Sequence, residues 1–105
     1  MFSITVGDDG EIHLSGRFDA SRVEQAEAVF NRVTNTCRVN FSELQYISSA
    51  GLGVLLKTQK RLSASGQSLI LIRMNKLVRD VFHIARFDLV FQIDEEQNPP
   101  PLKMS

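Results

Sequence analysis

The start of the chain alternates between apolar and polar side chains in two short runs. "FSITV" occupies residues 2–6 and "EIHLSG" residues 11–16, and the "GDDG" between them is typical of a tight turn. Successive side chains of a strand point to opposite faces, so Ile12 and Leu14 share one face. The pattern predicts an opening β-hairpin.

The apolar period becomes helical in "DASRVEQAEAVFNRV", residues 19–33. Apolar residues that fall along one side of such a helix are Val23, Ala26, Phe30 and Val33. Ser21 is followed three residues later by Glu24, which is the pattern of a capping box. The sequence therefore predicts a helix that Ser21 caps.

A third strand and a second helix are predicted in the middle of the chain. "CRVNF", residues 37–41, places Cys37, Val39 and Phe41 on one face of a strand. "GLGVLLKTQKRLSASG", residues 51–66, has helical spacing and ends at Gly66. Its inward residues are expected to be Leu52, Leu55, Leu56 and Leu62, and its outward residues Lys57, Lys60 and Arg61.

The last third adds two strands and a helix. "SLILI", residues 68–72, is continuously apolar, as expected of a central strand covered on both faces, and "LVFQI", residues 89–93, predicts a final strand. Between them "NKLVRDVFHIA" predicts a helix capped by Asn75. Its buried residues are expected to be Leu77, Val78, Val81, Phe82 and Ala85.

Strands that alternate with helices after a hairpin predict an α/β fold: a mixed, mostly parallel β-sheet with helices packed on it. One domain is expected over residues 1–94. Residues 95–105 contain all three prolines and are expected to form a flexible C-terminal tail.

Composition excludes several classes of function. Twelve basic and twelve acidic residues give zero net charge, so nucleic acid is not an expected partner. No apolar run approaches the ~20 residues of a membrane span, and the N-terminus lacks the features of a secretory signal, so membrane insertion is not expected and a cytoplasmic location is. Cys37 is the single cysteine and is interpreted as a small buried apolar residue. No Cys/His cluster has metal-ligand spacing, and no metal or cofactor is expected.

The candidate chemistry lies at "YISSAGLG", residues 46–53, where a predicted strand meets a predicted helix. Binding sites of α/β sheets gather at such points. A phosphate-binding P-loop is disfavoured because Val54 and Leu55, rather than lysine and serine or threonine, follow Gly53. A serine nucleophile is disfavoured because the first glycine of the G-x-S-x-G elbow is missing and no partner base is visible, so no enzyme is predicted.

A simple helix cap by Ser48 or Ser49 stays open at this point. It does not account for Gly51 and Gly53, because each glycine in a helix costs up to about 1 kcal/mol relative to alanine. Glycines there leave a bare patch beside the hydroxyl groups, which the backbone of another protein can approach. The sequence therefore favours a recognition surface.

The same stretch resembles the STAS domain of anti-sigma factor antagonists. The resemblance rests on "ISSAGLGVLL", on "VNFSELQY" before it and on "LSGRFDAS" upstream, and it extends through "ARFDLVFQI". It implies the STAS fold, and it implies that the serine at the start of the second helix is phosphorylated by a partner that is both a serine kinase and an anti-sigma factor.

Matched by position, Ser49 is the implied phosphoacceptor, with Ser48 as the alternative. Asp19 matches an acidic residue near the phosphoserine, and the implied partner surface comprises Asp19, Ser48, Ser49, Gly51, Leu52, Gly53 and Lys57. Ser48 and Asn40 stand where the family often has aspartate, Asn40 at the expected end of the third strand. The region is therefore expected to be less acidic than in relatives.

The resemblance implies an anti-sigma factor antagonist that is switched by reversible serine phosphorylation. Its implied partners are an anti-sigma factor and serine kinase of the histidine-kinase-like ATPase type, and a serine phosphatase. The alternative is a STAS accessory subunit of a transporter ATPase or signalling scaffold that uses the same surface without phosphorylation.

Overall fold

A computed structural model describes residues 1–94, and the predicted C-terminal tail, residues 95–105, lies outside the described residues. Ten elements follow one another along the chain. They are β1 (Phe2–Val6), β2 (Ile12–Phe18), the 3-10 turn η1 (Ala20–Arg22), α1 (Val23–Phe30), β3 (Cys37–Ile47), α2 (Ser49–Ser63), β4 (Leu69–Ile72), α3 (Lys76–Ile84), the 3-10 turn η2 (Phe87–Leu89) and β5 (Gln92–Asp94).

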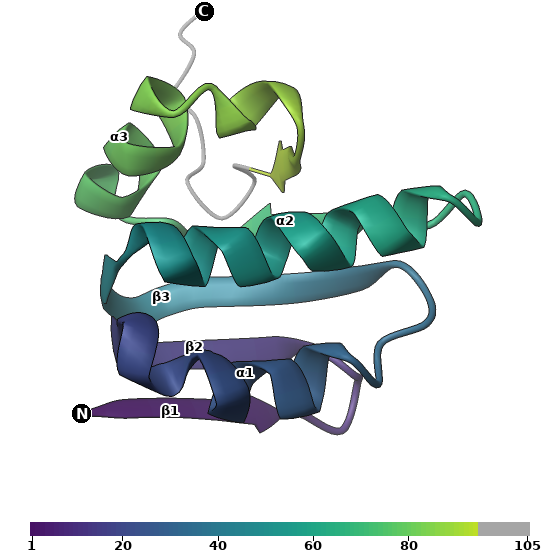
Figure 1. Cartoon of the computed structure of the whole chain (residues 1–105), viewed down its shortest axis with the longest axis horizontal. Coiled ribbons are helices and arrows are strands. Elements are labelled where there is room, and N and C mark those ends of the chain that lie inside the picture. Colours follow the sequence, from purple (N-terminus) through teal and green to yellow (C-terminus); the bar gives the residue numbers. More distant parts are fainter. Residues whose placement is uncertain (95–105) are drawn as a thin grey trace, which may run out of the picture.

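The five strands form one sheet in the order β1-β2-β3-β4-β5. β1 pairs with β2 antiparallel, and each later strand is parallel to the strand before it. This confirms the predicted α/β fold, with its opening hairpin and mixed, mostly parallel sheet (Figure 1). Because β2, β3 and β4 are parallel, their carboxyl ends share one edge, and α1, α2 and α3 are reached from that edge.

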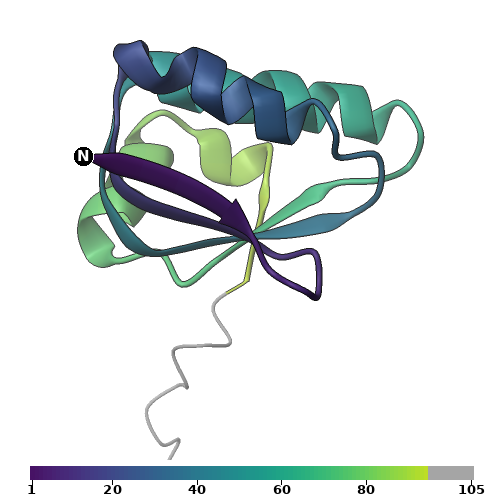
Figure 2. The same cartoon turned by 90° about the horizontal axis from the view of Figure 1, so that it is seen from below.

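The core occupies the helix-bearing side of the sheet. Alternate strand residues are buried there together with one stripe of each helix. They include Phe2, Ile12, Leu14, Val39, Phe41, Leu69 and Leu71 from the strands and Ala26, Phe30, Leu55, Leu62, Val78 and Phe82 from the helices. α1 and α2 lie side by side on this face (Figure 2). The opposite face of the sheet, called the open face below, carries polar side chains such as those of His13 and Arg38, as period-two alternation requires.

The N-terminal residue is built into the sheet edge. Arg17 N donates a hydrogen bond to the carbonyl oxygen of Met1 at 2.8 Å. Gly16 lies between these partners with φ 82°, and a Cβ on Gly16 would overlap the Met1 carbonyl. Glycine is therefore required here on both steric and conformational grounds.

The first helix begins differently from the prediction. Asp19 caps a turn of 3-10 helix that precedes α1: its Oδ1 accepts hydrogen bonds from Ser21 N at 3.1 Å and from Ser21 Oγ at 2.6 Å, while the start of α1 has no side-chain cap. The prediction of a capping box between Ser21 and Glu24 is wrong, because the Ser21 hydroxyl donates its hydrogen bond to Asp19. A turn of 3-10 helix, η1, then leads into α1.

The last third also departs from its prediction. Leu77 is 66% exposed and Ala85 is exposed, because the buried stripe of the short α3 is narrow and centres on Val78 and Phe82. The predicted strand at residues 89–93 begins only at Gln92. The stretch before it forms η2, which places the ring of Phe87 at 6.3 Å from that of Phe82.

No helix within residues 1–94 has both the length and the apolar character needed to cross a bilayer.

Candidate functional site at the start of α2

Ser48 joins β3 to α2 and caps the helix. Its backbone is extended, and its Oγ accepts a hydrogen bond from Gly51 N at 3.1 Å. One of the amides that a helix start leaves unpaired is thereby satisfied. Of the two serines that the sequence left open for this role, Ser48 is the cap.

Ser49 is the first residue of α2 and is exposed. Its hydroxyl makes no hydrogen bond within residues 1–94. The two adjacent hydroxyls therefore have different surroundings: that of Ser48 binds the helix backbone, and that of Ser49 faces solvent without a partner. An anion on Ser49 would lie at the positive end of the dipole of a 15-residue helix.

Asp19 reaches this site because β2 and β3 end together. Phe18 pairs with Ile47 in register, and Ser48 N donates to the carbonyl oxygen of Phe18 at 2.9 Å. Asp19 follows Phe18 directly and so lies beside the start of α2. The hydroxyl hydrogen bond from Ser21 is the main cause that lowers the pKa of the Asp19 carboxyl, assisted by the Ser21 amide and by the charges of Arg22 and Arg17.

The two glycines have different structural roles. A Cβ on Gly51 would lie 2.9 Å from Ile47 Cγ1 and 3.1 Å from the carbonyl oxygen of Phe18, so the buried Gly51 allows α2 to pack closely on the strand ends. A Cβ on Gly53 would meet no atom within 4 Å, and Gly53 is exposed. Packing within the described domain explains Gly51 but leaves Gly53 unexplained.

The remaining predicted surface residues lie at different depths. Leu52 is only 8% exposed and belongs to the core. The Lys57 ammonium is exposed and pairs with the Glu27 carboxylate on α1 at 3.3 Å. Lys57 is eight residues after Ser49, which places it about 12 Å along the helix axis. Asp19, Ser48, Ser49 and Gly53 are thus gathered at the helix start, while Lys57 marks a position farther along.

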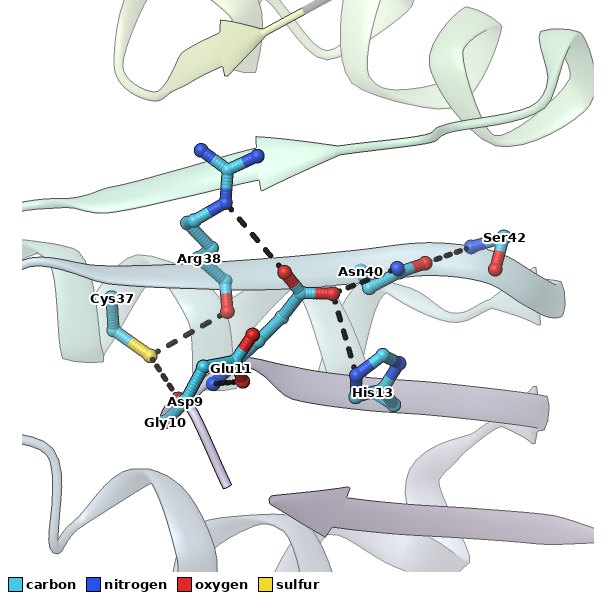
Figure 3. Close-up of polar contacts among 8 residues, drawn as sticks. All are labelled: Asp9, Gly10, Glu11, His13, Cys37, Arg38, Asn40 and Ser42. Carbon is cyan, nitrogen blue, oxygen red and sulfur yellow. Dashed lines mark hydrogen bonds and ion pairs between the residues drawn. The ribbon is translucent and has the colours of Figure 1, made fainter. Parts of the chain in front are cut away.

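The prediction for Asn40 is wrong. β3 continues for seven residues beyond it, so Asn40 is about 23 Å from the strand end and does not affect the charge around Ser49. Its Nδ2 donates to Glu11 Oε2 at 2.9 Å, and its Oδ1 accepts from Ser42 N at 2.9 Å. The Glu11 carboxylate also contacts His13 at 3.3 Å and Arg38 at 3.6 Å, so these polar residues form a separate cluster on the open face (Figure 3).

The structure adds a pair of residues that sequence reasoning missed. The Arg17 guanidinium lies 4.3 Å from the centre of the Tyr46 ring, and the two residues are register partners on β2 and β3. Tyr46 is 39% exposed and precedes the capping serine by two residues. Tyr46 belongs to residues 46–53, which the sequence singled out. Only the strand register shows that Arg17 lies over its ring.

Within residues 1–94 neither histidine is placed to act as a general base for Ser48 or Ser49. His13 contacts Glu11, and His83 Nδ1 contacts Asp88 Oδ2 at 3.0 Å on α3 and η2. Neither histidine contacts Ser48 or Ser49 in the described part of the chain. Within residues 1–94 there is also no group of three His, Cys, Asp or Glu residues that could hold a metal ion.

The sheet with its opening hairpin and the capped helix that presents the exposed Ser49 define an α/β domain of one recognisable family. The matching family model is described as "Mlab, STAS domain" and spans residues 4–92. The chain therefore belongs to the STAS domain family.

Two relatives cover most of the chain. One is the proposed anti-sigma factor antagonist BtrV of Bordetella bronchiseptica, 32% identical over 84 residues, which are 76% of this chain and 72% of that protein. The other is the anti-sigma-B factor antagonist of Staphylococcus epidermidis, 25% identical over 89% of this chain and 90% of that protein.

Solved structures share the fold. A proposed anti-sigma factor antagonist from Thermotoga maritima superposes with a TM-score of 0.73 at 23% identity, over 93% of this chain and 90% of that one. The Bacillus cell fate determinant SpoIIAA, in its phosphorylated form, gives a TM-score of 0.64 at 24% identity, over 93% and 95% of the two chains.

Proposed function

We propose that this protein is an anti-sigma factor antagonist of the cytoplasm, a binding protein without catalytic turnover. It binds an anti-sigma factor that is also a serine kinase of the histidine-kinase-like ATPase type. Phosphorylation of Ser49 by that kinase ends the complex, and a serine phosphatase restores binding. The named function of the two relatives supports the general role.

One observation carries the choice of Ser49: its hydroxyl is exposed and unpaired at the helix start, whereas Ser48 holds the cap. A kinase can approach the Ser49 hydroxyl without breaking a hydrogen bond of the domain. The Ser48 oxygen is part-buried and engaged with Gly51 N, so it would have to leave the cap to enter a kinase active site. Ser48 is therefore the less accessible of the two phosphoacceptors.

The consequence of phosphorylation follows from charge. A phosphate on Ser49 adds about −1.5 to −2 charges at pH 7, and the helix N-terminus accommodates an anion. The domain stays folded. A partner packed closely over Ser49 would have to bury that charge, and each 1.4 kcal/mol of such a penalty weakens binding about tenfold.

The partner surface consists of Asp19, Ser48, Ser49 and Gly53, with Gly51 and Leu52 supporting it from beneath and Lys57 at its edge. Exposed Gly53 supports this choice, because no contact inside the described domain requires glycine there. A partner that packs over the α2 start does require it.

The decisive experiment is a pull-down from the native cytoplasm, followed by mass spectrometry of both the captured protein and the phosphosite. Capture of an ATPase-type serine kinase and phosphate on Ser49 after incubation with ATP are expected. Phosphate on Ser48 alone would move the switch by one residue. Phosphate on neither serine, with transporter or scaffold subunits captured, would support the non-phosphorylated accessory role instead.

A further inference from the structure

A cleft of about 530 Å³ opens where the end of α1, the tip of the β1–β2 hairpin and the start of β3 meet. Its volume lies within the ~300–1,000 Å³ typical of small-molecule sites. Cys37 lines it at the first residue of β3, ten residues before Ile47. About 33 Å of strand therefore separates this cleft from the α2 start.

The wall of the cleft is largely apolar. Val6 and Ile12 come from the hairpin, and Val29 and Val33 from the end of α1 and the residues after it. Val6 is 56% exposed, although it lies beside these apolar neighbours. An apolar group placed in the cleft would cover this surface and be removed from water itself, which is favourable in proportion to the area buried.

Arg32 is the only charged residue in the lining of the cleft. Within residues 1–94 its guanidinium makes no ion pair or hydrogen bond, and the side chains of Thr34 and Asn35 in the same lining also make no hydrogen bond there. A guanidinium presents several donors in a fixed plane, which matches a carboxylate. The free polar groups of the cleft therefore suit an anion.

The neighbouring acids do not cancel this charge. Asp9 Oδ1 accepts a hydrogen bond from Glu11 N at 2.9 Å. The Glu11 carboxylate is held by Arg38, His13 and Asn40 on the open face of the sheet (Figure 3). Both carboxylates have partners of their own, and neither residue is part of the lining of the cleft.

We propose that this cleft binds a small organic anion, a monocarboxylate whose apolar body lies on Val6, Ile12, Val29 and Val33 and whose carboxylate pairs with Arg32. The site is independent of the proposed function at Ser49. Cys37 is part of its wall: the thiol lies 3.6 Å from the carbonyl oxygens of Gly10 and Arg38 and is half-buried. Burial raises the pKa of this thiol, so it stays protonated at neutral pH and acts here as a contact surface.

The single cysteine makes the proposal directly testable. The rate at which iodoacetamide alkylates Cys37 is measured in the intact protein, with decanoate or decanol added below the concentration at which decanoate forms micelles. Decanoate is expected to slow the alkylation much more than decanol, because only decanoate can pair with Arg32. The variant R32Q is expected to bind decanoate about tenfold more weakly, as for the loss of one charge-assisted hydrogen bond.

R38Q is the matched control. Arg38 adjoins Cys37 in sequence, but its guanidinium pairs with Glu11, so decanoate should protect Cys37 in R38Q as it does in the unchanged protein. Equal protection by decanoate and decanol, or full protection in R32Q, would overturn the assignment of an anion site. The same would follow if decanoate shifted the backbone amide resonances of α3, where Leu77 and Ile84 are exposed, and left those of residues 29–37 unchanged.

Discussion

Gly51 of α2 rests directly against Phe18 of β2: a Cβ on Gly51 would lie 3.1 Å from both Cγ and the carbonyl oxygen of Phe18. The same carbonyl oxygen accepts the hydrogen bond from Ser48 N. The end of β2 therefore fixes both the cap and the first turn of α2. The exposed Ser49 is held in place by this contact.

The two glycines of the helix start should respond oppositely to alanine. G51A should lower the free energy of unfolding by about 1–2 kcal/mol, because overpacking outweighs the gain in helix propensity. G53A should raise it by up to about 1 kcal/mol, because its Cβ meets nothing. Urea denaturation of the two variants measures both effects, and equal changes would contradict the different roles assigned to them.

G53A also tests the partner surface without damaging the fold. If a partner packs over the α2 start, the added methyl group should weaken binding even though the domain is more stable. Isothermal titration with the partner captured in the pull-down measures this. A more stable variant with undiminished affinity would remove Gly53 from the interface.

Alanine variants of the two serines should differ in stability. S48A should lower the free energy of unfolding by about 0.5–2 kcal/mol through loss of the cap, while S49A should leave it nearly unchanged. S49A should keep partner binding and resist phosphorylation. S49D should stay folded and bind the partner much more weakly, because docking would desolvate its charge.

Thermal unfolding and binding assays distinguish this result from a simple cap at Ser49. A cap at that position would make alanine the damaged variant and aspartate as good as serine, in melting temperature and in binding alike.

The cap made by Asp19 should depend on pH. Its carboxyl has a pKa lowered from the ordinary value of 3.8, mainly by the hydrogen bond from the Ser21 hydroxyl. Its contribution to stability is therefore fully present above pH 3.8 and is lost as the pH falls through the lowered value. D19A should be less stable than the unchanged protein at pH 7, and the gap should narrow in strong acid. Urea denaturation across this range measures the gap, and a constant gap would show that the charge is not involved.

The Arg17–Tyr46 pair should contribute to partner binding. Arginine and tyrosine are enriched at binding hot spots, and this pair lies beside the α2 start on an exposed surface. Y46A should weaken binding by about 1 kcal/mol or more, whereas T5A, on the distant part of the same open face, should have no effect. Equal affinities of the two variants would confine the interface to the helix start.

Periodicity was sufficient to predict the α/β order and the buried faces of β2, α1 and α2, because each depends on local spacing. It failed where distant residues decide. Leu77 was predicted to be buried because it is an apolar residue of a helix. Which face of α3 is covered depends instead on a distant contact, that of Phe41 with Phe82. The start of the last strand was misplaced for the same reason: the ring of Phe91 packs against those of Phe82 and Phe87, and the strand begins only at Gln92.

The junction of a strand and a helix at residues 46–53 was predicted correctly, since strand ends and helix starts can be recognised from sequence. The separate structural roles of its two serines and two glycines could not be predicted. Assigning the cap to Ser48 requires the backbone conformation at that residue, and explaining Gly51 requires the position of Phe18 across the sheet. Asn40 was misjudged because the predicted strand ended six residues too early, at Phe41 instead of Ile47.

The hydrogen bond between Met1 and Arg17 offers a practical opportunity for spectroscopy. It fixes the first residue beside the end of β2, on the side of the domain where α2 begins (Figure 1). Met1 is 89% exposed. A fluorophore attached at residue 1 would therefore lie in solvent beside the folded domain. Such a dye would sit close to Asp19 and report docking by a change in anisotropy, with every side chain of the site intact. By the same geometry, a bulky fusion at this end would shield the very surface under study.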